Sequence, residues 1–305
     1  MDLSAAALRV NQTIRTVVVG LDGSVESMAA LRWAGGVIAH DGVIHAVAAI
    51  SPARELAIAA VQIDSAQVIT TLTRELEADW TAPVKDAGHN VVCHVIEDDP
   101  ADALLQISTT VDADLIVVGI HAKPKHAPRT VGRVTAKLVH HTDRPLAIVD
   151  DGVEGPRAEL STVVAHAGHG ATTDAPVQWA AGFADAHDTG LTLVRSTPNR
   201  PALGPDGLLD VLAFYLDPAM LREWAAEDLA RLADEIQQST EQHLRITWSS
   251  TSGAAGPRLI EASADAALIV VGRDTQAGQG HVMSNELRHV IVHAPCPVVV
   301  IPPDR

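Results

Sequence analysis

The sequence repeats itself, and this repeat constrains the fold more than any other feature. Three short segments recur in the same order in the two halves of the chain: LRWA at 31–34 and VQWA at 177–180, ADLIVVG at 113–119 and AALIVVG at 266–272, and PLAIV at 145–149 and PVVVI at 297–301. Landmarks that repeat in order indicate a duplicated domain. Because a domain commonly contains about 150 residues, a chain of 305 residues is predicted to contain two.

A linker separates the two predicted domains. Residues 150–160 read DDGVEGPRAEL, and this mixture of charged residues, glycine and proline is typical of a segment between domains. We therefore expect a first domain at residues 1–150 and a second domain at residues 151–305.

Short apolar runs alternate with longer segments of helical period in both halves. Runs rich in valine and isoleucine predict strands buried on both faces at 16–19, 43–50, 91–96, 115–118, 146–149, 162–165, 191–194, 244–248, 268–271 and 297–301. Helices are predicted between them at 24–38, at 55–87 with room for breaks, from 99, after 132, from 174, at 218–242, after 256 and after 284. This alternation produces right-handed crossovers, so the predicted fold class is α/β, with two tandem, doubly wound, five-stranded parallel sheets.

Composition excludes several classes of function. Lysine and arginine number 22 against 38 aspartate and glutamate residues, and the resulting formal charge of −16 repels nucleic-acid phosphates and anionic lipids. No apolar run reaches the roughly 18 residues that a membrane span needs, and the N-terminal apolar patch is too short for a secretion signal. Two cysteines far apart in sequence, Cys93 and Cys296, fit a reducing compartment. We therefore expect a cytoplasmic protein that binds neither nucleic acid nor membranes.

The predicted topology places a ligand site between two loops. In a doubly wound sheet, ligands bind beyond the carboxyl ends of the strands where the winding direction reverses, which here means the loops after strands 16–19 and 115–118. The first loop, residues 20–24, reads GLDGS, and the second runs from Gly119 to a predicted helix start at Gly132. Backbone amides at a helix N-terminus, with glycine allowing close approach, form a cradle for phosphate.

Basic residues gather in the second loop and in the helix after it. Residues 115–142 contain no acid but contain five bases, which are Lys123, Lys125, Arg129, Arg133 and Lys137. In so acidic a chain this stretch predicts a local anion site, although a solvated surface loop would have the same composition. The corresponding stretch of the second half carries Arg273 and Arg288, offset by Asp274 and Glu286. The two halves are therefore not equivalent.

Together these features resemble the universal stress protein family in its tandem, two-domain form of the actinobacterial type, over nearly the whole chain. The resemblance rests on VVVGLDGS at 17–24, LRWA at 31–34, ADLIVVG at 113–119 and HAPCPVVVIP at 293–302. It implies a Rossmann-like, adenine-nucleotide-binding fold for each domain and a role in the response to stress.

The resemblance also implies a nucleotide site in the first domain. Family members that bind ATP carry an aspartate after the first strand and the pattern G-x2-G-x9-G-S/T after the fourth, which correspond to Asp22 and to Gly119, Ala122, Gly132 and Arg133. Ala122 and Arg133 depart from this pattern, and Arg133 would either replace a hydroxyl contact with a charged one or point to solvent. The predicted cofactor-binding residues are Leu21, Asp22, Gly23, Ser24, Gly119, Ala122, Arg129, Gly132, Arg133 and Thr135. The implied cofactor is ATP, with or without magnesium.

The second half departs much further from the family pattern. Its first loop, at 165–170, contains no acid, and Thr275 and Ser284 stand where the second and third glycines are expected. Of the pattern's glycines it keeps Gly272. We therefore expect the second domain to have lost the nucleotide site and to serve in pairing and stabilisation.

Two functions fit these expectations. The first is a stress-response regulator or sensor that binds ATP, or a related adenine nucleotide, in the first domain only and hydrolyses ATP slowly at most. The alternative is a nucleotide-free, dimerising scaffold in which both sites have decayed. An adenylyl-transferring enzyme is disfavoured, because neither a reactive constellation nor a substrate domain is visible, and no catalytic residue is assigned.

The last strand, at 297–301, is a candidate pairing edge, as it is in the family. It would join either two chains in a homodimer or the two domains of one chain. A regulator of this kind also implies a protein partner, whose identity the sequence does not specify.

Histidines and tryptophans suggest no further site. His140 lies beside His141, and His166 lies close to His169, but no cysteine or acid nearby completes a ligand set, so no metal is expected. Tryptophans at equivalent helical positions, one in each LRWA-like segment, are predicted to pack in the core rather than to stack on a ligand.

Overall fold

Strands and helices alternate along both halves of the chain, as the sequence predicts. The computed structural model describes residues 13–51, 65–120, 130–152, 162–168, 174–197, 218–240, 244–273 and 283–303. The first half contains β1 (Thr16–Gly20), α1 (Val25–Val37), β2 (Val43–Ala49), α3 (Ser65–Arg74), the π-helix η1 (Glu75–Trp80), α4 (Ala82–Asp86), β3 (Asn90–Ile96), α5 (Pro100–Thr110), β4 (Leu115–Gly119), α6 (Arg133–His141) and β5 (Leu146–Val149). The second half contains β6 (Thr162–His166), α7 (Asp174–Ala186), β7 (Gly190–Thr197), α9 (Pro218–Ser239), β8 (Ile246–Ser252), α10 (Ala255–Ala262), β9 (Leu268–Gly272), α11 (Asn285–His293) and β10 (Val298–Ile301).

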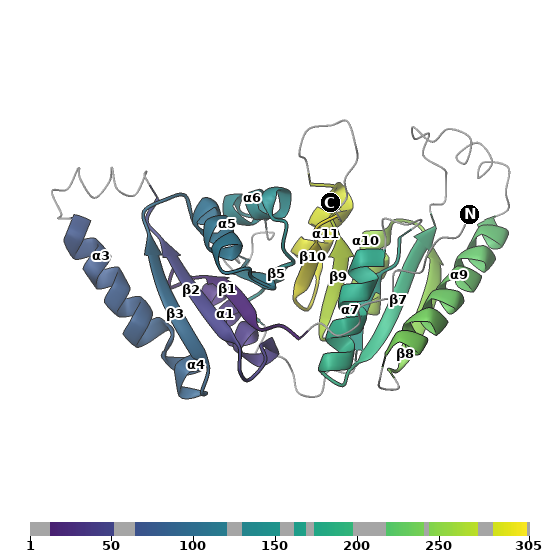
Figure 1. The fold of residues 1–305 in the computed structure, drawn as a ribbon. Helices are drawn as coiled ribbons and strands as arrows, with labels where there is room; N and C mark the ends of the chain where they lie inside the picture. Colours follow the sequence, from purple (N-terminus) through teal and green to yellow (C-terminus); the bar gives the residue numbers. More distant parts are fainter. Residues whose placement is uncertain are drawn as a thin grey trace.

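The strands lie side by side in one ten-stranded sheet, in the order β3-β2-β1-β4-β5-β10-β9-β6-β7-β8 (Figure 1). Within each half the neighbouring strands are parallel, which confirms the predicted doubly wound α/β fold. The halves meet where β5 and β10 pair antiparallel, with Val299 opposite Ala147. Of the two predicted uses of the last strand, the structure contains the pairing between the domains of one chain.

Helices cover both faces of the sheet, and each covered face has one core that runs through both halves. The first core lies under α1, η1 and α4 in the first half and under α7 and α9 in the second. The second core lies under α5, α6, α10 and α11. Among the residues that the structure describes, no helix has the length and apolar character needed to cross a membrane.

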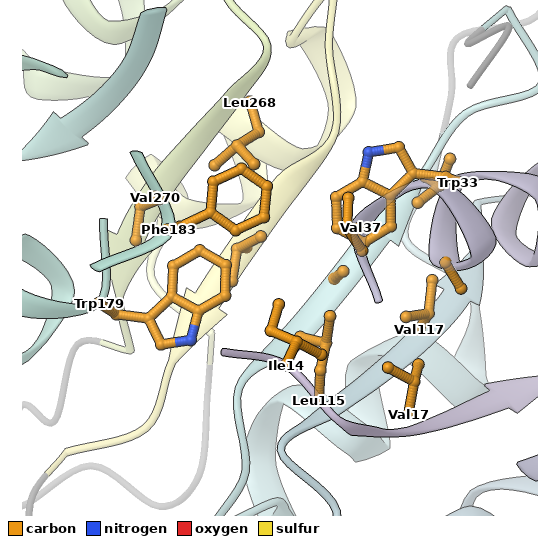
Figure 2. Close-up of a cluster of buried hydrophobic side chains, with 14 of the residues drawn as sticks. Ile14, Val17, Trp33, Val37, Leu115, Val117, Trp179, Phe183, Leu268 and Val270 are labelled. Carbon is orange, nitrogen blue, oxygen red and sulfur yellow. The ribbon is translucent and has the colours of Figure 1, made fainter. Parts of the chain in front are cut away.

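The first core joins the two halves at α1 and α7 (Figure 2). Trp33 and Val37 come from α1, and Trp179 and Phe183 come from α7. Trp33 is 1% exposed and Trp179 is 4% exposed, which confirms that both tryptophans pack in the core. The rings of Trp179 and Phe183 stack with 5.3 Å between their centroids.

Two regions add detail to the sequence expectation. The helical segment predicted at 55–87, with room for breaks, is divided within its described part into α3, η1 and α4, and a proline in the first turn of α4 fits the start of a new helix because it needs no amide partner there. Residues 55–64 of that prediction lie outside the described residues. Strand β7 continues to Thr197 and strand β8 to Ser252, beyond their predicted ends. The residues that extend them are mostly polar, and β8 is an edge strand, so they carry no continuous apolar signal in the sequence.

Replacing Trp33 with alanine is expected to lower the free energy of unfolding by about 3–5 kcal/mol, because it leaves a cavity in the core that both halves share. The matched control is Trp224→Ala on α9, where the indole is 50% exposed and a loss within about 0.5 kcal/mol is expected. Chemical denaturation followed by circular dichroism measures both changes. Equal losses in the two variants would contradict the assignment of Trp33 to the shared core.

Candidate functional site

A cavity of 250 Å³ opens at the carboxyl ends of β1 and β4, where the sequence predicts the ligand site. Its walls come from the loop after β1, the ends of β2 and β4, the start of α5 and the start of α6. The lining residues are Gly20, Leu21, Asp22, Ser24, Ser27, Val47, Ala49, Pro100, Leu104, Val118, Gly119, Gly132, Arg133, Val134 and Thr135. The fold therefore brings the first predicted loop together with Gly119 and Gly132, the two ends of the second.

Most of the predicted site residues that the structure describes line this cavity. These residues are Leu21, Asp22, Ser24, Gly119, Gly132, Arg133 and Thr135. Gly23 is not among the lining residues. Ala122 and Arg129 lie outside the described residues, as do Lys123 and Lys125.

The loop after β1 is organised by the carboxylate of Asp22. Its Oδ1 accepts a hydrogen bond from the amide of Ser24 at 3.0 Å and another from the Ser24 hydroxyl at 2.5 Å. Ser24 Oγ in turn accepts from the amide of Ser27 at 3.2 Å and caps α1, at the predicted start of this helix. Asp22 therefore shapes the turn that begins α1 and also lines the cavity.

The structural reason for glycine differs among three positions of the two predicted loops. Gly23 has a φ of +79°, and a Cβ there would lie 2.7 Å from Cζ2 of Trp80. A Cβ at Gly119 would lie 2.6 Å from the carbonyl carbon of Glu26. At Gly132, by contrast, no heavy atom of the described residues lies within 4 Å of an added Cβ. The fold itself therefore requires glycine at 23 and 119, whereas the packing around Gly132 does not.

Apolar side chains form one wall that the sequence analysis did not assign to the site. Val47 and Ala49 lie at the end of β2, Leu104 comes from α5, and Val118 comes from β4. Val47 and Leu104 are buried. The end of β2 could have been assigned to the site from the sequence, because parallel neighbouring strands have their carboxyl ends at the same edge of the sheet.

Two of the predicted bases are paired with acids at the start of α5. Arg133 Nη2 lies 2.7 Å from Asp99 Oδ2, and Lys137 Nζ lies 3.3 Å from Asp99 Oδ1 and 2.6 Å from Asp102 Oδ2. These pairs were not predicted from the sequence. They connect the N-termini of α5 and α6, and they offset part of the positive charge predicted for this edge. The Arg133 side chain is 81% exposed, so it is free to reorient toward an anion.

The ion pairs also set the ionisation of Asp99. Burial opposes its ionisation, but the hydrogen bonds from Lys137 and from the amide of Ala101, with the charges of Lys137 and Arg133, outweigh burial and lower its pKa. The hydrogen bond to Asp102 is the main reason that the pKa of Lys137 is raised. Asp99 also caps α5, because its Oδ1 accepts from the Ala101 amide at 3.1 Å.

The matching edge of the second half has a cavity of 330 Å³ with different walls. His166 stands in the position of Gly20, since His166 pairs with Val194 as Gly20 pairs with Val47. Val47 lines the first cavity, but Val194 is not among the described residues that line the second. The second cavity is therefore not lined by β7, the strand that corresponds to β2, and His166 forms part of its wall.

The helix start at the second cavity also differs in charge. Ser284 caps α11 by accepting from the amide of Leu287 at 3.1 Å, and Glu286 lies in the first turn and lines the cavity. The first turn of α6 carries no acid. Because a carboxylate at this position opposes the binding of an anion at the helix N-terminus, the second cavity is less suited to phosphate than the first.

Other candidate groups form no site within the described residues. Groups of three or more potential metal ligands are absent from that part of the chain. His45 Nδ1 lies 2.9 Å from His94 Nε2 on the neighbouring strand, and burial lowers the pKa of both imidazoles. Burial raises the pKa of the Cys296 thiol to about 12, so this cysteine is a structural residue.

Comparison with known proteins identifies relatives over nearly the whole chain. The model of the universal stress protein family matches residues 13–150 and 162–302. The universal stress protein Rv2005c of Mycobacterium tuberculosis is 22% identical over 323 aligned positions, which cover 93% of this chain and 96% of that protein. The crystal structure of a universal stress protein from Archaeoglobus fulgidus has a TM-score of 0.63 at 14% identity and covers 94% of this chain and 98% of its own. A universal stress protein solved in complex with cAMP covers 46% of this chain and 100% of its own, at 25% identity and a TM-score of 0.34.

Two glycine substitutions separate the requirements of the fold from those of the cavity. Gly23→Ala is expected to lower the free energy of unfolding by about 1–3 kcal/mol, because alanine is strained at positive φ and would overlap Trp80. Gly132→Ala is expected to change it by about 0.5 kcal/mol or less, because the backbone there is extended and the added Cβ has space. Urea denaturation of both variants gives the comparison, and similar losses would contradict it.

At pH 7, Asp99→Asn is expected to lower the free energy of unfolding by about 0.5–1 kcal/mol, because asparagine keeps the cap of α5 but removes the charge that pairs with Arg133 and Lys137. A lowered pKa means that this stabilisation is present above the ordinary value of 3.8 and is lost as the pH falls through the folded-state value. The difference between wild type and variant should therefore shrink toward about pH 3. Urea denaturation at several pH values measures it, and a difference independent of pH would contradict the pairing.

Proposed function

Because the chain belongs to the universal stress protein family, we propose that it is a stress-response regulator or sensor that binds ATP, or a related adenine nucleotide, in its first domain only. The proposed domains are residues 1–150 and residues 151–305. The observation that carries the proposal is the meeting, in one cavity, of an apolar wall and an open helix N-terminus that begins with glycine.

The apolar wall suits a nucleotide base. Val47, Ala49 and Leu104 offer van der Waals contact and remove water from an aromatic ring, which favours burial of the base. Polar groups at the mouth of the cavity, including the Ser24 hydroxyl and the Asp22 carboxylate, lie in reach of ligand hydroxyls or of a bound magnesium ion. We assign Asp22 this role in addition to its role in the turn.

The start of α6 suits the phosphates. The first amides of a helix lack partners within the helix and attract anions, and the helix dipole adds to this attraction. Gly132 leaves space for a phosphate to approach, and Thr135 contributes a hydroxyl one turn into the helix. Arg133 would exchange its exposed pair with Asp99 for a charge-assisted hydrogen bond to phosphate. When bound, magnesium would supply further neutralisation of the phosphate charge.

The proposed asymmetry between the domains rests on two replacements in the second cavity. His166 stands where the first domain has Gly20, and Glu286 brings negative charge to the helix start. We therefore propose that the second domain binds no nucleotide triphosphate and serves to stabilise the first. ATP turnover, if measured, should be slow, because the proposal assigns the cavity residues to binding rather than to catalysis.

We also propose that the protein acts in the cytoplasm and transmits its state to a protein partner. The free cysteines Cys93 and Cys296 support a reducing compartment. A second candidate function is a nucleotide-free scaffold, and the pairing of Arg133 and Lys137 with acids favours it, because these bases already have partners. Both candidate functions are compatible with a homodimer of this chain.

Calorimetric titration with ATP and magnesium distinguishes the two functions. Wild type should bind one ATP per chain, and Asp22→Ala should bind at least about tenfold more weakly, because a charged contact at the site is lost. Asp234→Ala, which removes an exposed carboxylate on α9, is the matched control and should bind as wild type does. Two ATP molecules per chain would refute the proposed asymmetry. Negligible binding by wild type and Asp22→Ala alike would favour the scaffold.

A further inference from the structure

We propose that the second domain positions the nucleotide site of the first domain through Arg273 and His187. These residues contact the C-terminal ends of α6 and α1, two of the three helices whose N-terminal ends reach the first cavity. The inference rests on the proposed function for its ligand, but the contacts that carry it involve only residues of this chain.

Arg273 lies directly after β9 and reaches across to the first domain. Its Nη1 lies 2.9 Å from the carbonyl oxygen of Val139, 3.0 Å from that of His140 and 2.8 Å from that of Thr142. Carbonyl groups in the last turn of a helix have no partner within the helix, and a positive charge there also interacts favourably with the helix dipole. One guanidinium from the second domain therefore satisfies the end of α6.

The opposite end of α6 is part of the proposed nucleotide site. Gly132, Arg133 and Thr135 line the first cavity, and the N-cap Gly132 provides no side-chain hydrogen bond. With 9 residues, α6 is short, and it packs on α5 and β5. Because so short a helix moves as one rod, anchoring its last turn fixes the place of its first amides.

A second contact, through an imidazole rather than a guanidinium, joins the second domain to the end of α1. His187 Nε2 lies 3.2 Å from the carbonyl oxygen of Val37, the last residue of α1. The imidazole stacks on Phe183 with 4.0 Å between ring centroids, which fixes its orientation. The N-terminal end of α1 begins at Ser24, beside Asp22 at the cavity. Two of the three helices that reach the site are thus contacted from the far side of the domain junction.

Ile120, the first-domain residue equivalent to Arg273, makes no such side-chain hydrogen bond to the second domain. Ile120 is its counterpart in the first domain, since each residue follows the matching LIVVG strand and donates its amide to the last residue of the neighbouring strand, Ile120 to Val149 and Arg273 to Ile301. Ile120 is 3% exposed and its side chain has no hydrogen-bond donor. The strand end therefore does not require arginine for the fold, and the domain proposed to lack nucleotide supplies the anchor to the domain proposed to bind it.

The test compares full-length variants by ATP titration and by hydrogen exchange without ligand. Arg273→Met removes the donors while keeping the apolar stem, and we expect about five- to tenfold weaker ATP binding with faster exchange of the α6 amides. Arg273→Lys should recover much of the affinity, because it keeps a charge and donors at the end of α6. Arg288→Met, an exposed arginine on α11, is the matched control and should behave as wild type.

The outcomes separate positioning from simple attachment of the domains. Arg273→Met with wild-type affinity and wild-type α6 exchange, but a lower melting temperature, would overturn the proposal. If wild type binds no ATP, the proposed function fails, while faster α6 exchange in Arg273→Met would still support positioning and unchanged exchange would overturn it. Should Arg273→Met not fold, His187→Leu decides by the same two measurements on α1, with unchanged affinity and exchange counting against the proposal.

Discussion

The antiparallel pairing of β5 with β10 is the interaction on which the rest of the structure depends. Its ladder joins residues 146–148 to residues 298–300 and turns two five-stranded sheets into one. The pairing removes two open strand edges, each of which would otherwise present unpaired backbone groups to solvent. It also makes the two cores continuous, because the helices on each face of the sheet meet at the same junction.

This junction explains how one domain can serve the other. Pairing of the last strands brings the start of the loop after β9 against the last turn of α6, and it brings the C-terminal end of α7 against that of α1. Both contacts lie at helix ends, where carbonyl groups need donors. The proposed division of labour, with binding in the first domain and support from the second, therefore follows from where the sheet is joined.

The two cavities show how a duplicated site diverges without loss of the fold. Each lies at the carboxyl edge of the sheet, between the strand pairs β1 and β4 or β6 and β9. Glycine is retained at the ends of β4 and β9, where an added Cβ would contact the neighbouring helix. Other residues of the two cavities differ, as His166 in place of Gly20 and Glu286 in the first turn of α11 illustrate. The glycines that packing requires are therefore kept, whereas other cavity residues have changed.

The sequence by itself determined the strands, the helices and their caps, because these depend on residue periodicity and on contacts within a few residues. Ser24, Asp99 and Ser284 each cap a helix that the sequence predicted to start at or directly after that residue, since a cap needs only an amide two or three residues ahead. The loops that approach each other at the first cavity also followed from strand order.

Only the tertiary structure decided which distant side chains meet. The pair of Arg133 with Asp99 spans 34 residues, and the contact of Arg273 with Val139 spans 134. Neither partner carries a local signal of the other, because a charged side chain in sequence is equally suited to solvent, to a ligand or to an ion pair. The sheet junction set these choices, since it fixes which helix ends face which loops.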